Sequence, residues 1–458
     1  MDDTVIIPAP ASKSLSHRAL MAAGLASGVS RLEGLLDSDD TKLTREVMTS
    51  LGARYSFAED GACVVTGLGG ALSSGSADAP LSLFVGESGT TCRLITAIAA
   101  AGRGWFRIHG SGRMHERPLG ELAGALEKLG ARIRFEGKDK CPPLVMQASG
   151  LTPPGSGKDK SLPPGVVKIG CDESSQYLSG LLLAAPLGAE LGILLGGNRA
   201  VSWPYVGLTL ELMEHFGVEF AVQALHGKGW RGIDWRNLRE AEPGKLRFIV
   251  RGGGFRAQDY RVEGDWSGAS YFLAAGAIGP KAVQIVGINA HSLQGDASII
   301  DIMRQMGAKI AIAEDSVTVS PSDLRGVDVD MGHCPDLVPT VAALAAHARG
   351  ETRIRNVAHL AIKESDRIAA PAAELAKAGC RVQAMRDGMV ISPPEKGMHA
   401  PVGGEAFSAH NDHRIAMSVA LLGLPGRSEK GFAVRLDNPG CVAKSFPAFW
   451  RLWEKVVA

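Results

Sequence analysis

The sequence is short of aromatic residues and has no excess of charge of either sign. Only 5% of its 458 residues are Phe, Trp or Tyr, and 49 Lys and Arg face 48 Asp and Glu, a formal net charge of +1. Few aromatics argue against a platform on which nucleic-acid bases stack. A protein that coats nucleic acid would also carry a strong basic excess. We therefore expect no nucleic acid among its partners.

Cysteines are few, and paired cysteine motifs are missing. The seven cysteines are an odd number, and no two form a Cys-x-x-Cys pair. This pattern fits neither a disulfide framework nor a zinc site, and it favours reduced cytosolic thiols. The Met1-Asp2-Asp3 start lacks the basic and apolar segments of a signal peptide. The apolar runs, such as Leu181–Pro186, are far shorter than the roughly 20 residues of a membrane span. We expect a cytoplasmic protein with no metal and no membrane contact.

Nucleotide-binding loops are also missing. The Gly155–Lys158 stretch lacks the spacing of a phosphate-binding loop, and no Gly-x-Gly-x-x-Gly follows a strand-like run. Ser149–Gly165, rich in Pro, Gly, Ser and Lys, is typical of a surface loop. Ala224–Lys245, with two Trp among charges, predicts an extended hairpin insertion.

Internal repetition is the main sign of organisation in the chain. Six segments share a polar or charged start, an Ala- and Leu-rich run and a closing Gly, and these glycines lie 71 to 91 residues apart. The run predicts a helix, and a closing Gly suits the left-handed position at a helix end. The six segments are Ala11–Gly28, Ser88–Gly104, Asp172–Gly188, Gly264–Gly279, Cys334–Gly350 and Asn411–Gly426.

A second element recurs between these segments. It is a helical pattern that ends in Gly and is followed at once by a strand-like run, at Gly52, Gly130, Gly217, Gly307 and Gly379. The pattern predicts strand, helix, strand, helix, strand, repeated about six times. The Ala-rich helices are apolar nearly all round and should be buried. Tandem duplication without an active site would also give this pattern.

Cations stand near the starts of some of these helices. A helix start carries partial positive charge and free N–H groups. Capping explains a Ser, Thr or Asp there, but it does not explain Lys13, Arg18, His413 or Arg414. Cations at such places suggest that an anion binds there.

Further basic residues gather in short motifs. Arg113–Pro118 predicts a tight turn with two arginines. Lys363–Arg367 predicts a helix with its two terminal cations on one face and Glu364 beside them, although a solvated helix would look the same. Lys444 lies in a short segment that ends in Ser-Phe-Pro.

At this point the motifs match a known family, in order and over nearly the whole chain. The chain resembles 5-enolpyruvylshikimate-3-phosphate synthase (3-phosphoshikimate 1-carboxyvinyltransferase) from Pro10 to Trp450. The matching segments are SKSLSHRA, SGTTCRL, RMHERPLG, SSQYLSGLLLAAP, VSWPYVGLTLELM, VEGDWSGASYFLAA, QGD, PDLVPTVAALA, IKESDR, NDHRIAM and AKSFP.

The resemblance implies an α/β fold of the inside-out α/β barrel type. Two domains would each hold three βαβαββ repeats with buried helices, and the active site would lie in the cleft between them. One domain would comprise 1–12 and 264–458, and the other 13–263.

The resemblance also implies a reaction. The carboxyvinyl group of phosphoenolpyruvate passes to the 5-hydroxyl of shikimate 3-phosphate, with release of phosphate, by addition–elimination through a tetrahedral intermediate. No cofactor or metal is implied, and we expect a monomer. The many cations of the motifs would offset the charges of two phosphates and two carboxylates.

By resemblance, individual residues receive roles. Asp336 would be the base for the 5-hydroxyl, and Glu364 would move the proton at the methylene carbon, while the division of donor and acceptor among Glu364, Lys13 and Lys444 stays open. Shikimate 3-phosphate would contact Lys13, Ser14, Arg18, Ser174, Ser175, Gln176, Ser202, Tyr205, Asp336, His359 and Lys363. Phosphoenolpyruvate would contact Lys13, Gly89, Thr90, Arg117, Gln176, Arg367, Arg414 and Lys444.

Two positions depart from the family pattern. Glu87 stands where the family usually has Asn, and its carboxylate would weaken anion binding unless it pairs with a cation such as Arg93 or Arg117. His359 stands where many members have Asn. Substrate contacts at both positions, and the response to the inhibitor glyphosate, are therefore left open.

Three rival functions are weaker. UDP-N-acetylglucosamine enolpyruvyl transferase shares the fold and donor, but its catalytic Cys lies in a Gly-rich loop, whereas Cys141 lies before two prolines. A non-catalytic binding module of this fold would have lost residues such as Asp336 or Glu364, and both are present. An RNA-end-processing relative would need a basic surface, which a net charge of +1 does not support.

Overall fold

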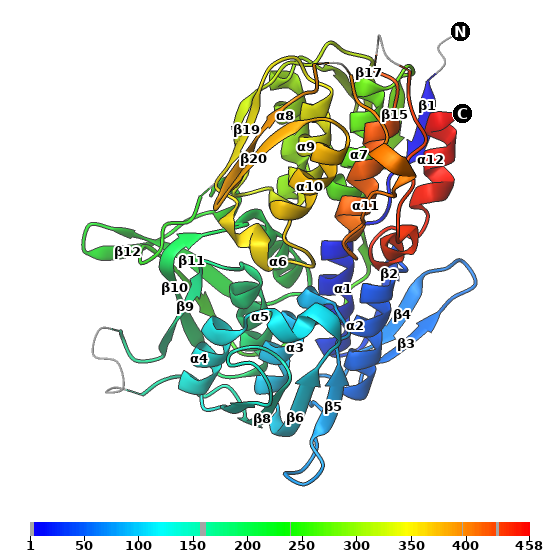
Figure 1. Cartoon of the computed structure of the whole chain (residues 1–458). Helices are drawn as coiled ribbons and strands as arrows, with labels where there is room; N and C mark the ends of the chain where they lie inside the picture. The colour runs from blue at the N-terminus through cyan, green and yellow to red at the C-terminus, as the bar shows by residue number, and fades with distance from the viewer. Residues whose placement is uncertain (1–3, 156–161, 239, 396, 427–429) are drawn as a thin grey trace. The chain divides into compact units, whose positions relative to one another are not determined.

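The computed structural model describes residues 4–155, 162–238, 240–395, 397–426 and 430–458 (Figure 1). The chain forms two compact units. The first unit comprises Met1–Ser12, Leu36–Asp39 and Glu263–Ala458, and the second comprises Lys13–Leu35 and Asp40–Val262. Among the described residues, no helix is both long enough and apolar enough to span a lipid bilayer.

The second unit contains three repeats of one element order, in which a strand and a helix alternate twice before two final strands, with one extra strand in the third repeat. Its helices are α1 (Lys13–Leu25), α2 (Asp39–Ser50), α3 (Gly89–Ala100), α4 (Gly120–Lys128), α5 (Gln176–Ala184) and α6 (Pro204–His215). Its strands are β2 (Val29–Glu33), β3 (Arg54–Phe57), β4 (Cys63–Thr66), β5 (Leu81–Phe84), β6 (Arg103–His109), β7 (Arg132–Phe135), β8 (Leu144–Ser149), β9 (Val166–Cys171), β10 (Leu191–Ala200), β11 (Phe220–His226), β12 (Gly229–Gly232), β13 (Leu246–Val250) and β14 (Tyr260–Arg261).

The first unit follows the same order in two of its repeats. Its helices are α7 (Trp266–Ile278), α8 (Ile299–Gln305), α9 (Val338–Ala346), α10 (Ala369–Lys377), α11 (His413–Ala420) and α12 (Phe449–Val457). Its strands are β1 (Val5–Pro8), β15 (Val283–Val286), β16 (Lys309–Ile312), β17 (Ser316–Ser320), β18 (Asp328–Asp330), β19 (Thr352–Arg355), β20 (Arg381–Met385) and β21 (Gly388–Ser392). In the third repeat the described residues show one bridge, between Phe407 and Leu436, and the chain ends in α12.

The sheets share one topology. In the sheet β5-β6-β8-β7, the first two strands are parallel and the other pairs are antiparallel, and the sheet β18-β19-β21-β20 is built alike. Two sheets are completed by strands distant in sequence. β14 lies parallel to β2, with Tyr260 opposite Leu32, and β1 lies parallel to β15, with Val5 opposite Val283. The last strand of the second unit, β14, thus completes the sheet of β2. The first strand of the first unit, β1, completes the sheet of β15.

The six Ala-rich segments form helices, as predicted, and these helices are buried. All 13 residues of α7 are buried, and so are all nine residues of α9. The strands at the sheet edges are largely exposed, for example β3 and β16. In each unit the apolar helices are therefore innermost and the sheets lie outside them, which is the predicted inside-out α/β arrangement. The hairpin predicted for 224–245 is present in part, because β11 and β12 pair antiparallel but β11 begins at Phe220 and β12 ends at Gly232.

The role predicted for the closing glycines is only partly right. Gly28, Gly104 and Gly350 have positive φ values of +113°, +127° and +85°, but Gly104 lies inside β6, and Gly28 and Gly350 lie three and four residues beyond the ends of α1 and α9. Gly188 and Gly279 have negative φ values of −112° and −78°. At Gly279 the reason for glycine is space, because a Cβ atom would lie 2.6 Å from the carbonyl oxygen of Ala275.

The helix predicted at Lys363–Arg367 is wrong. The segment is a turn that links the short 3-10 helix η6 (Ala358–Ile362) to α10, which begins at Ala369. The charged groups of this turn take part in an ion-pair network described below.

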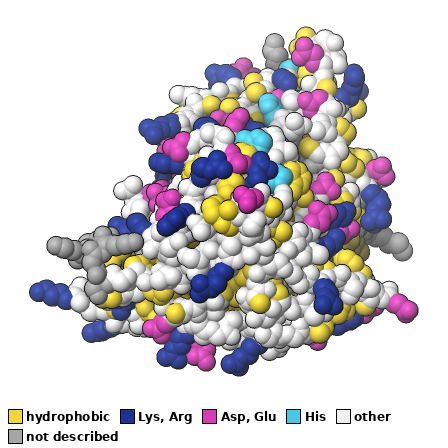
Figure 2. Space-filling model, turned by 90° about the horizontal axis from the view of Figure 1, so that it is seen from below, with side chains coloured by type: hydrophobic (Ala, Val, Ile, Leu, Met, Phe, Trp, Pro, Cys, Tyr) yellow, Lys and Arg dark blue, Asp and Glu magenta, His cyan; other side chains and the backbone are white. Residues whose placement is uncertain are grey.

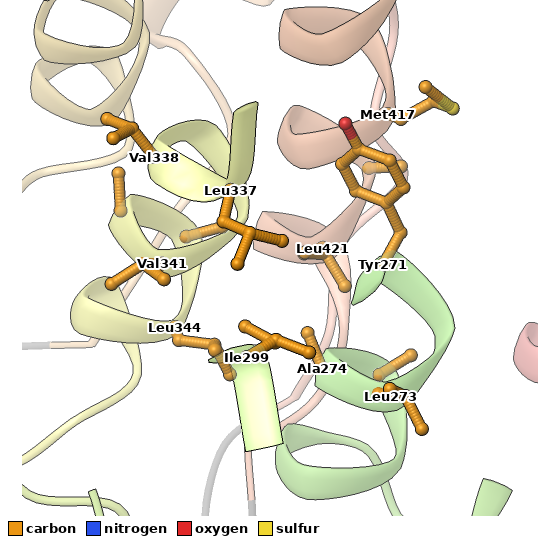
Figure 3. Close-up of a cluster of buried hydrophobic side chains, with 14 of the residues drawn as sticks. Tyr271, Leu273, Ala274, Ile299, Leu337, Val338, Val341, Leu344, Met417 and Leu421 are labelled. Atoms are coloured by element: carbon orange, nitrogen blue, oxygen red, sulfur yellow. The ribbon is translucent and has the colours of Figure 1, made fainter. Parts of the chain in front are cut away.

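The core of the first unit lies where its buried helices meet. Figure 3 shows Leu337, Val338, Val341 and Leu344, from the start and body of α9, beside Ile299 of α8 and side chains of α7. Tyr271 of α7 and Met417 of α11 lie at one end of this cluster. Helices with few polar side chains gain most of their stability from such packing rather than from their own hydrogen bonds.

All seven cysteines are free thiols, as predicted. Six are buried, and Cys441 is half-buried. Burial raises the pKa of Cys92 to about 11 and that of Cys171 to about 12.

Candidate functional site

The predicted site residues form two clusters, one in each unit. In the second unit they sit at the starts of α1, α3, α5 and α6. In the first unit they sit around the starts of α9 and α11 and in the turn before α10. The described residues contain no group of three or more His, Cys, Asp or Glu that could hold a metal ion.

Lys13 opens α1 and is held by a carboxylate that the sequence analysis did not single out. Its Nζ lies 2.5 Å from Oδ2 of Asp40, which is buried in the first turn of α2. This ion pair offsets the unfavourable position of a cation at a helix start. The sequence signal for Asp40 was the Asp-Ser-Asp-Asp segment at residues 37 to 40, which leads into the first turn of α2.

Arg18 is buried one turn into α1 and ties α1 to α6. Its Nε donates to Oγ1 of Thr209 at 2.8 Å, and its Nη groups donate to the carbonyl oxygens of Ser14 and Tyr205 at 2.9 and 3.0 Å. Burial lowers the pKa of Arg18 to about 10, so it stays charged at neutral pH. Three of its five N–H groups thus bind the protein itself.

The starts of α3 and α5 are joined by side chains. Nε2 of Gln176 donates to Oγ1 of Thr90 at 2.8 Å, and Nη1 of Arg93 donates to Oε1 of Gln176 at 2.9 Å. The amide of Gln176 is therefore fixed at both its ends. Sequence reasoning missed Arg93 as its partner, since the two residues are 83 positions apart.

Arg117 is pressed against the start of α3. A Cβ atom at Gly89 would overlap its guanidinium group, so only glycine permits this approach. Its Nη1 donates to the backbone carbonyl oxygen of Glu87 at 3.4 Å. The Glu87 carboxylate packs against Gly112, whose φ is +52° and which opens the 3-10 turn η1 (Gly112–Glu116). The structure thus directs this carboxylate to the backbone of the turn that precedes Arg117.

The predicted phosphate ligands of the second unit are buried serines near helix starts. Oγ of Ser174 accepts from the backbone N–H of Gln176 at 3.2 Å. Ser175 precedes α5, and Ser202 precedes α6, where Tyr205 is the second residue. Ser202 has a φ of +54°, a strained value for a residue with a side chain, and such strain is common at functional sites.

Asp336 lies between two arginines. Its Oδ1 accepts from Nη1 of Arg367 at 3.0 Å, and its Oδ2 accepts from Nη2 of Arg414 at 2.7 Å. Burial opposes ionisation, but Arg414, Arg367 and Lys363 outweigh it and hold the pKa of Asp336 well below its usual range. This carboxylate is therefore ionised at neutral pH, in the direction expected for a charged base.

Arg367 is the centre of the same network. It binds Asp412 with two parallel hydrogen bonds, from Nε at 2.7 Å and from Nη2 at 3.0 Å, and it lies 2.9 Å from the carboxylate of Glu364. Asp412 is fully buried, accepts from Ser365 and caps α11 by accepting from the N–H of Arg414. Two-pronged Arg–carboxylate pairs fix geometry as well as charge. Asp412 stands at the start of one of the six Ala-rich helices, where capping alone accounts for an Asp, and its pairing with Arg367 was not predicted.

A second buried carboxylate is coupled to Asp336. Burial and the charge of Asp336 raise the pKa of Asp296 to about 7, and Asp296 accepts a hydrogen bond from Ser267. The sequence segment QGD contains Asp296, but nothing in it assigned the residue a role. Of these two carboxyl groups, Asp336 therefore ionises at the lower pH.

The remaining predicted residues lie in turns of the first unit. His359 is buried in η6, and Lys363 is the residue directly after the end of η6. Lys444 ends the 3-10 helix η9 (Pro439–Lys444), which packs on α11.

Comparison with known proteins bears on this arrangement. The family model of EPSP synthase (3-phosphoshikimate 1-carboxyvinyltransferase) matches residues 3–228 and 239–453. The 3-phosphoshikimate 1-carboxyvinyltransferase of Marinomonas sp. (strain MWYL1) is 38% identical over 98% of this chain and 96% of the relative. That of Aeromonas salmonicida (strain A449) is 39% identical over 96% of this chain and 93% of the relative.

Solved structures show the same fold. An EPSP synthase from Acinetobacter baumannii aligns with a TM-score of 0.72 at 24% identity, over 99% of this chain and 95% of that one. The enolpyruvyl transferase NikO from Streptomyces tendae aligns with a TM-score of 0.68 at 19% identity, over 100% and 94%. With the match of the family model to nearly every residue, the chain belongs to the EPSP synthase (3-phosphoshikimate 1-carboxyvinyltransferase) family.

Proposed function

We propose that the chain uses the two clusters to carry out the reaction of its family. The protein is a transferase of the shikimate pathway, which supplies aromatic amino acids. It transfers the carboxyvinyl group of phosphoenolpyruvate to the 5-hydroxyl of shikimate 3-phosphate and releases phosphate, by addition–elimination.

One observation supports the assignment of roles most directly. Asp336 is an ionised carboxylate between two arginines, and Glu364 lies on the same Arg367. A base and a second carboxylate within one cationic network suit a reaction in which one proton leaves a hydroxyl and another moves at a carbon. The arginines would also bind an incoming carboxylate or phosphate.

The proposed reaction has two steps, an addition and an elimination. The 5-hydroxyl oxygen bonds to C2 of phosphoenolpyruvate, its proton passes to Asp336, and C3 gains a proton to become a methyl group. In elimination, the bond from C2 to the phosphate oxygen breaks, and the methyl group loses a proton to restore the double bond. Glu364 is the proposed carrier of the proton at C3. Whether Lys13 or Lys444 shares that role stays open.

The proposed binding residues follow the two clusters. Shikimate 3-phosphate would bind Ser14, Arg18, Ser174, Ser175, Ser202, Tyr205, His359 and Lys363, together with Lys13, Gln176 and Asp336. Phosphoenolpyruvate would bind Gly89, Thr90, Arg117, Arg367, Arg414 and Lys444, together with Lys13 and Gln176.

Phosphate release tests the function. We expect release from phosphoenolpyruvate when shikimate 3-phosphate is present, and none when UDP-N-acetylglucosamine replaces it as the acceptor. Release only with the sugar nucleotide would assign the chain to the related UDP-N-acetylglucosamine transferase. Release with neither acceptor would contradict a catalytic role.

We further propose a cytoplasmic monomer. The large hydrophobic side chains that are exposed among the described residues lie on different elements, which does not favour one extensive protein interface. They are Ile6, Val29, Phe57, Phe84, Ile312, Val402 and Val457. On the face shown in Figure 2, acidic and basic side chains are intermixed. Sedimentation equilibrium at micromolar concentration should give the mass of one chain, 48.0 kDa.

A further inference from the structure

A buried chain of hydrogen bonds links three helices of the second unit. Nδ1 of His17 in α1 lies 2.7 Å from Oγ1 of Thr44 in α2. That oxygen lies 2.7 Å from Oγ1 of Thr91 in α3, which lies 2.7 Å from Oγ of Ser88. All four side chains are 0% exposed. The three helices lie next to one another in Figure 1.

The donor and acceptor at each hydrogen bond follow from the protonation state of His17. Burial, and then the charge of Lys13, lower the pKa of His17 to about 3, against a smaller opposing effect of Asp40. The ring is therefore neutral and carries one N–H. Its Nε2 has no hydrogen-bond partner. Because a buried N–H without an acceptor is costly, the proton belongs on Nδ1, which donates to Thr44.

The hydroxyl groups then follow in one order. The hydroxyl of Thr44 has two acceptors within reach, Oγ1 of Thr91 at 2.7 Å and the carbonyl oxygen of Asp40 at 3.3 Å, and the shorter contact favours donation to Thr91. In that order Thr91 donates to Ser88. Ser88 also accepts from the backbone N–H of Thr91 at 3.3 Å, which makes it the N-cap of α3. Successive hydrogen bonds of this kind polarise one another and resist displacement of any one member.

The chain connects two parts of the proposed site. Lys13 lies four residues before His17 on α1, and Gly89 and Thr90 directly follow Ser88. The helix between them, α2, carries both Asp40, which binds Lys13, and Thr44, one turn later. Within this chain of hydrogen bonds, Thr44 thus links His17 on α1 to Thr91 on α3.

We propose that Thr44 is a positioning residue, which sets the phosphoenolpyruvate-binding start of α3 relative to Lys13 on α1. The inference rests on the proposed function for the roles of Lys13, Gly89 and Thr90. The alternative is that Ser88 only caps α3. Capping needs Ser88 and the N–H of Thr91 alone, so substitution of Thr44 would then leave the KM for phosphoenolpyruvate unchanged.

The test compares two isosteric substitutions. Thr44→Val removes the central hydroxyl, and we expect the KM for phosphoenolpyruvate to rise about tenfold while the KM for shikimate 3-phosphate changes less than about twofold. Thr96→Val is the matched control, because Thr96 is equally buried on α3 and its hydroxyl donates to the carbonyl oxygen of Cys92 at 2.7 Å, outside the chain. It should leave both KM values within about twofold of the parent protein.

Two further variants separate positioning from a loss of stability. Thr44→Ser restores the hydroxyl and should restore the KM for phosphoenolpyruvate. Thr44→Ala lacks both the hydroxyl and the added apolar bulk, and it serves where Thr44→Val does not fold. Equal KM values for phosphoenolpyruvate in the Thr44→Val or Thr44→Ala protein and in the Thr96→Val protein would overturn the proposal, as would failure of Thr44→Ser to rescue.

The outcome is distinguishable from a failure of the proposed function. An inactive parent protein with shikimate 3-phosphate would reject the function before any variant is made. An active parent whose KM for phosphoenolpyruvate does not respond to loss of the Thr44 hydroxyl would reject only the positioning role.

Discussion

At the scale of single residues, charge rather than exposure decides which buried carboxylate is ionised. Asp336 and Asp296 are both buried in the first unit, yet their pKa values move in opposite directions. Arg414 is hydrogen-bonded to Asp336 at 2.7 Å, whereas the hydrogen-bonding neighbour of Asp296 is the neutral Ser267. Asp336 is therefore the ionised carboxylate of the two, as the proposed role of base requires.

Removal of the Asp336 carboxylate should slow turnover strongly. We expect Asp336→Ala to lower kcat at least about 100-fold, the usual contribution of a general base, while both substrates still bind. Asp328→Ala is the control, because Asp328 also pairs with an arginine, Arg355, but at an exposed site. Its kcat should stay within about twofold. Equal kcat values for the two variants would remove Asp336 from the catalytic role.

His17 should make stability depend on pH. The unfolded chain binds a proton at the usual pKa of 6.5, whereas the folded chain does so only near pH 3. Between these values the unfolded state holds more protons, so the free energy of unfolding falls as the pH drops, by about 2 kcal/mol from this residue at pH 5.

The His17 effect is measurable as a difference between variants. In urea unfolding of the second unit, His17→Asn should cost about 2 kcal/mol less at pH 5 than at pH 7, since the variant lacks the titrating group. A cost that is equal at the two pH values would show that His17 does not stay neutral in the folded protein.

At the scale of elements, glycine has opposite effects on stability inside α4 and just after its end. Gly124 lies inside the helix, and a Cβ atom there would meet nothing within 4 Å, so Gly124→Ala should stabilise by about 0.5–1 kcal/mol. Gly130 follows the helix with a φ of +104°, so Gly130→Ala should destabilise by about 1–2 kcal/mol. Midpoints of urea unfolding would reveal the two signs. A shift of the same sign in both variants would contradict the role of backbone conformation.

The elements were largely predictable from sequence because their signals are local. Apolar composition and a terminal Gly mark the buried helices, and the runs after Gly52 and Gly130 form β3 and β7. The turn at Lys363–Arg367 was not predictable in this way. Its conformation depends on Asp336 and Asp412, which approach Arg367 from 31 and 45 positions away.

The site shows the same division between local and long-range information. The motifs identified Asp336, Arg367 and Arg414 as candidates, and the structure brings these three together. The partners that hold them could not be read from spacing. Asp40 and Thr44 act on groups of α1 and α3 from a separate helix, and no local pattern encodes those contacts.

At the scale of the whole molecule, charge balance and local charge are independent. The chain carries a net charge of +1, yet Arg367, Arg414 and Lys363 all act on one carboxylate. The small net charge limits long-range attraction of polyanions, while the local cations suit small, highly charged substrates. The repeat pattern is likewise a property of the whole chain, because β1 and β14 complete repeats that begin far away in sequence.

The burial of the cysteines gives the protein a natural set of unfolding reporters. Cys63, Cys92, Cys141 and Cys171 lie in the second unit, and Cys334, Cys380 and Cys441 lie in the first. Alkylating reagents attack the thiolate, which burial makes scarce in the folded chain. Pulses of such a reagent in rising urea, read by mass spectrometry of the peptides, would time the opening of each unit separately. The wild-type sequence would serve, with no label introduced.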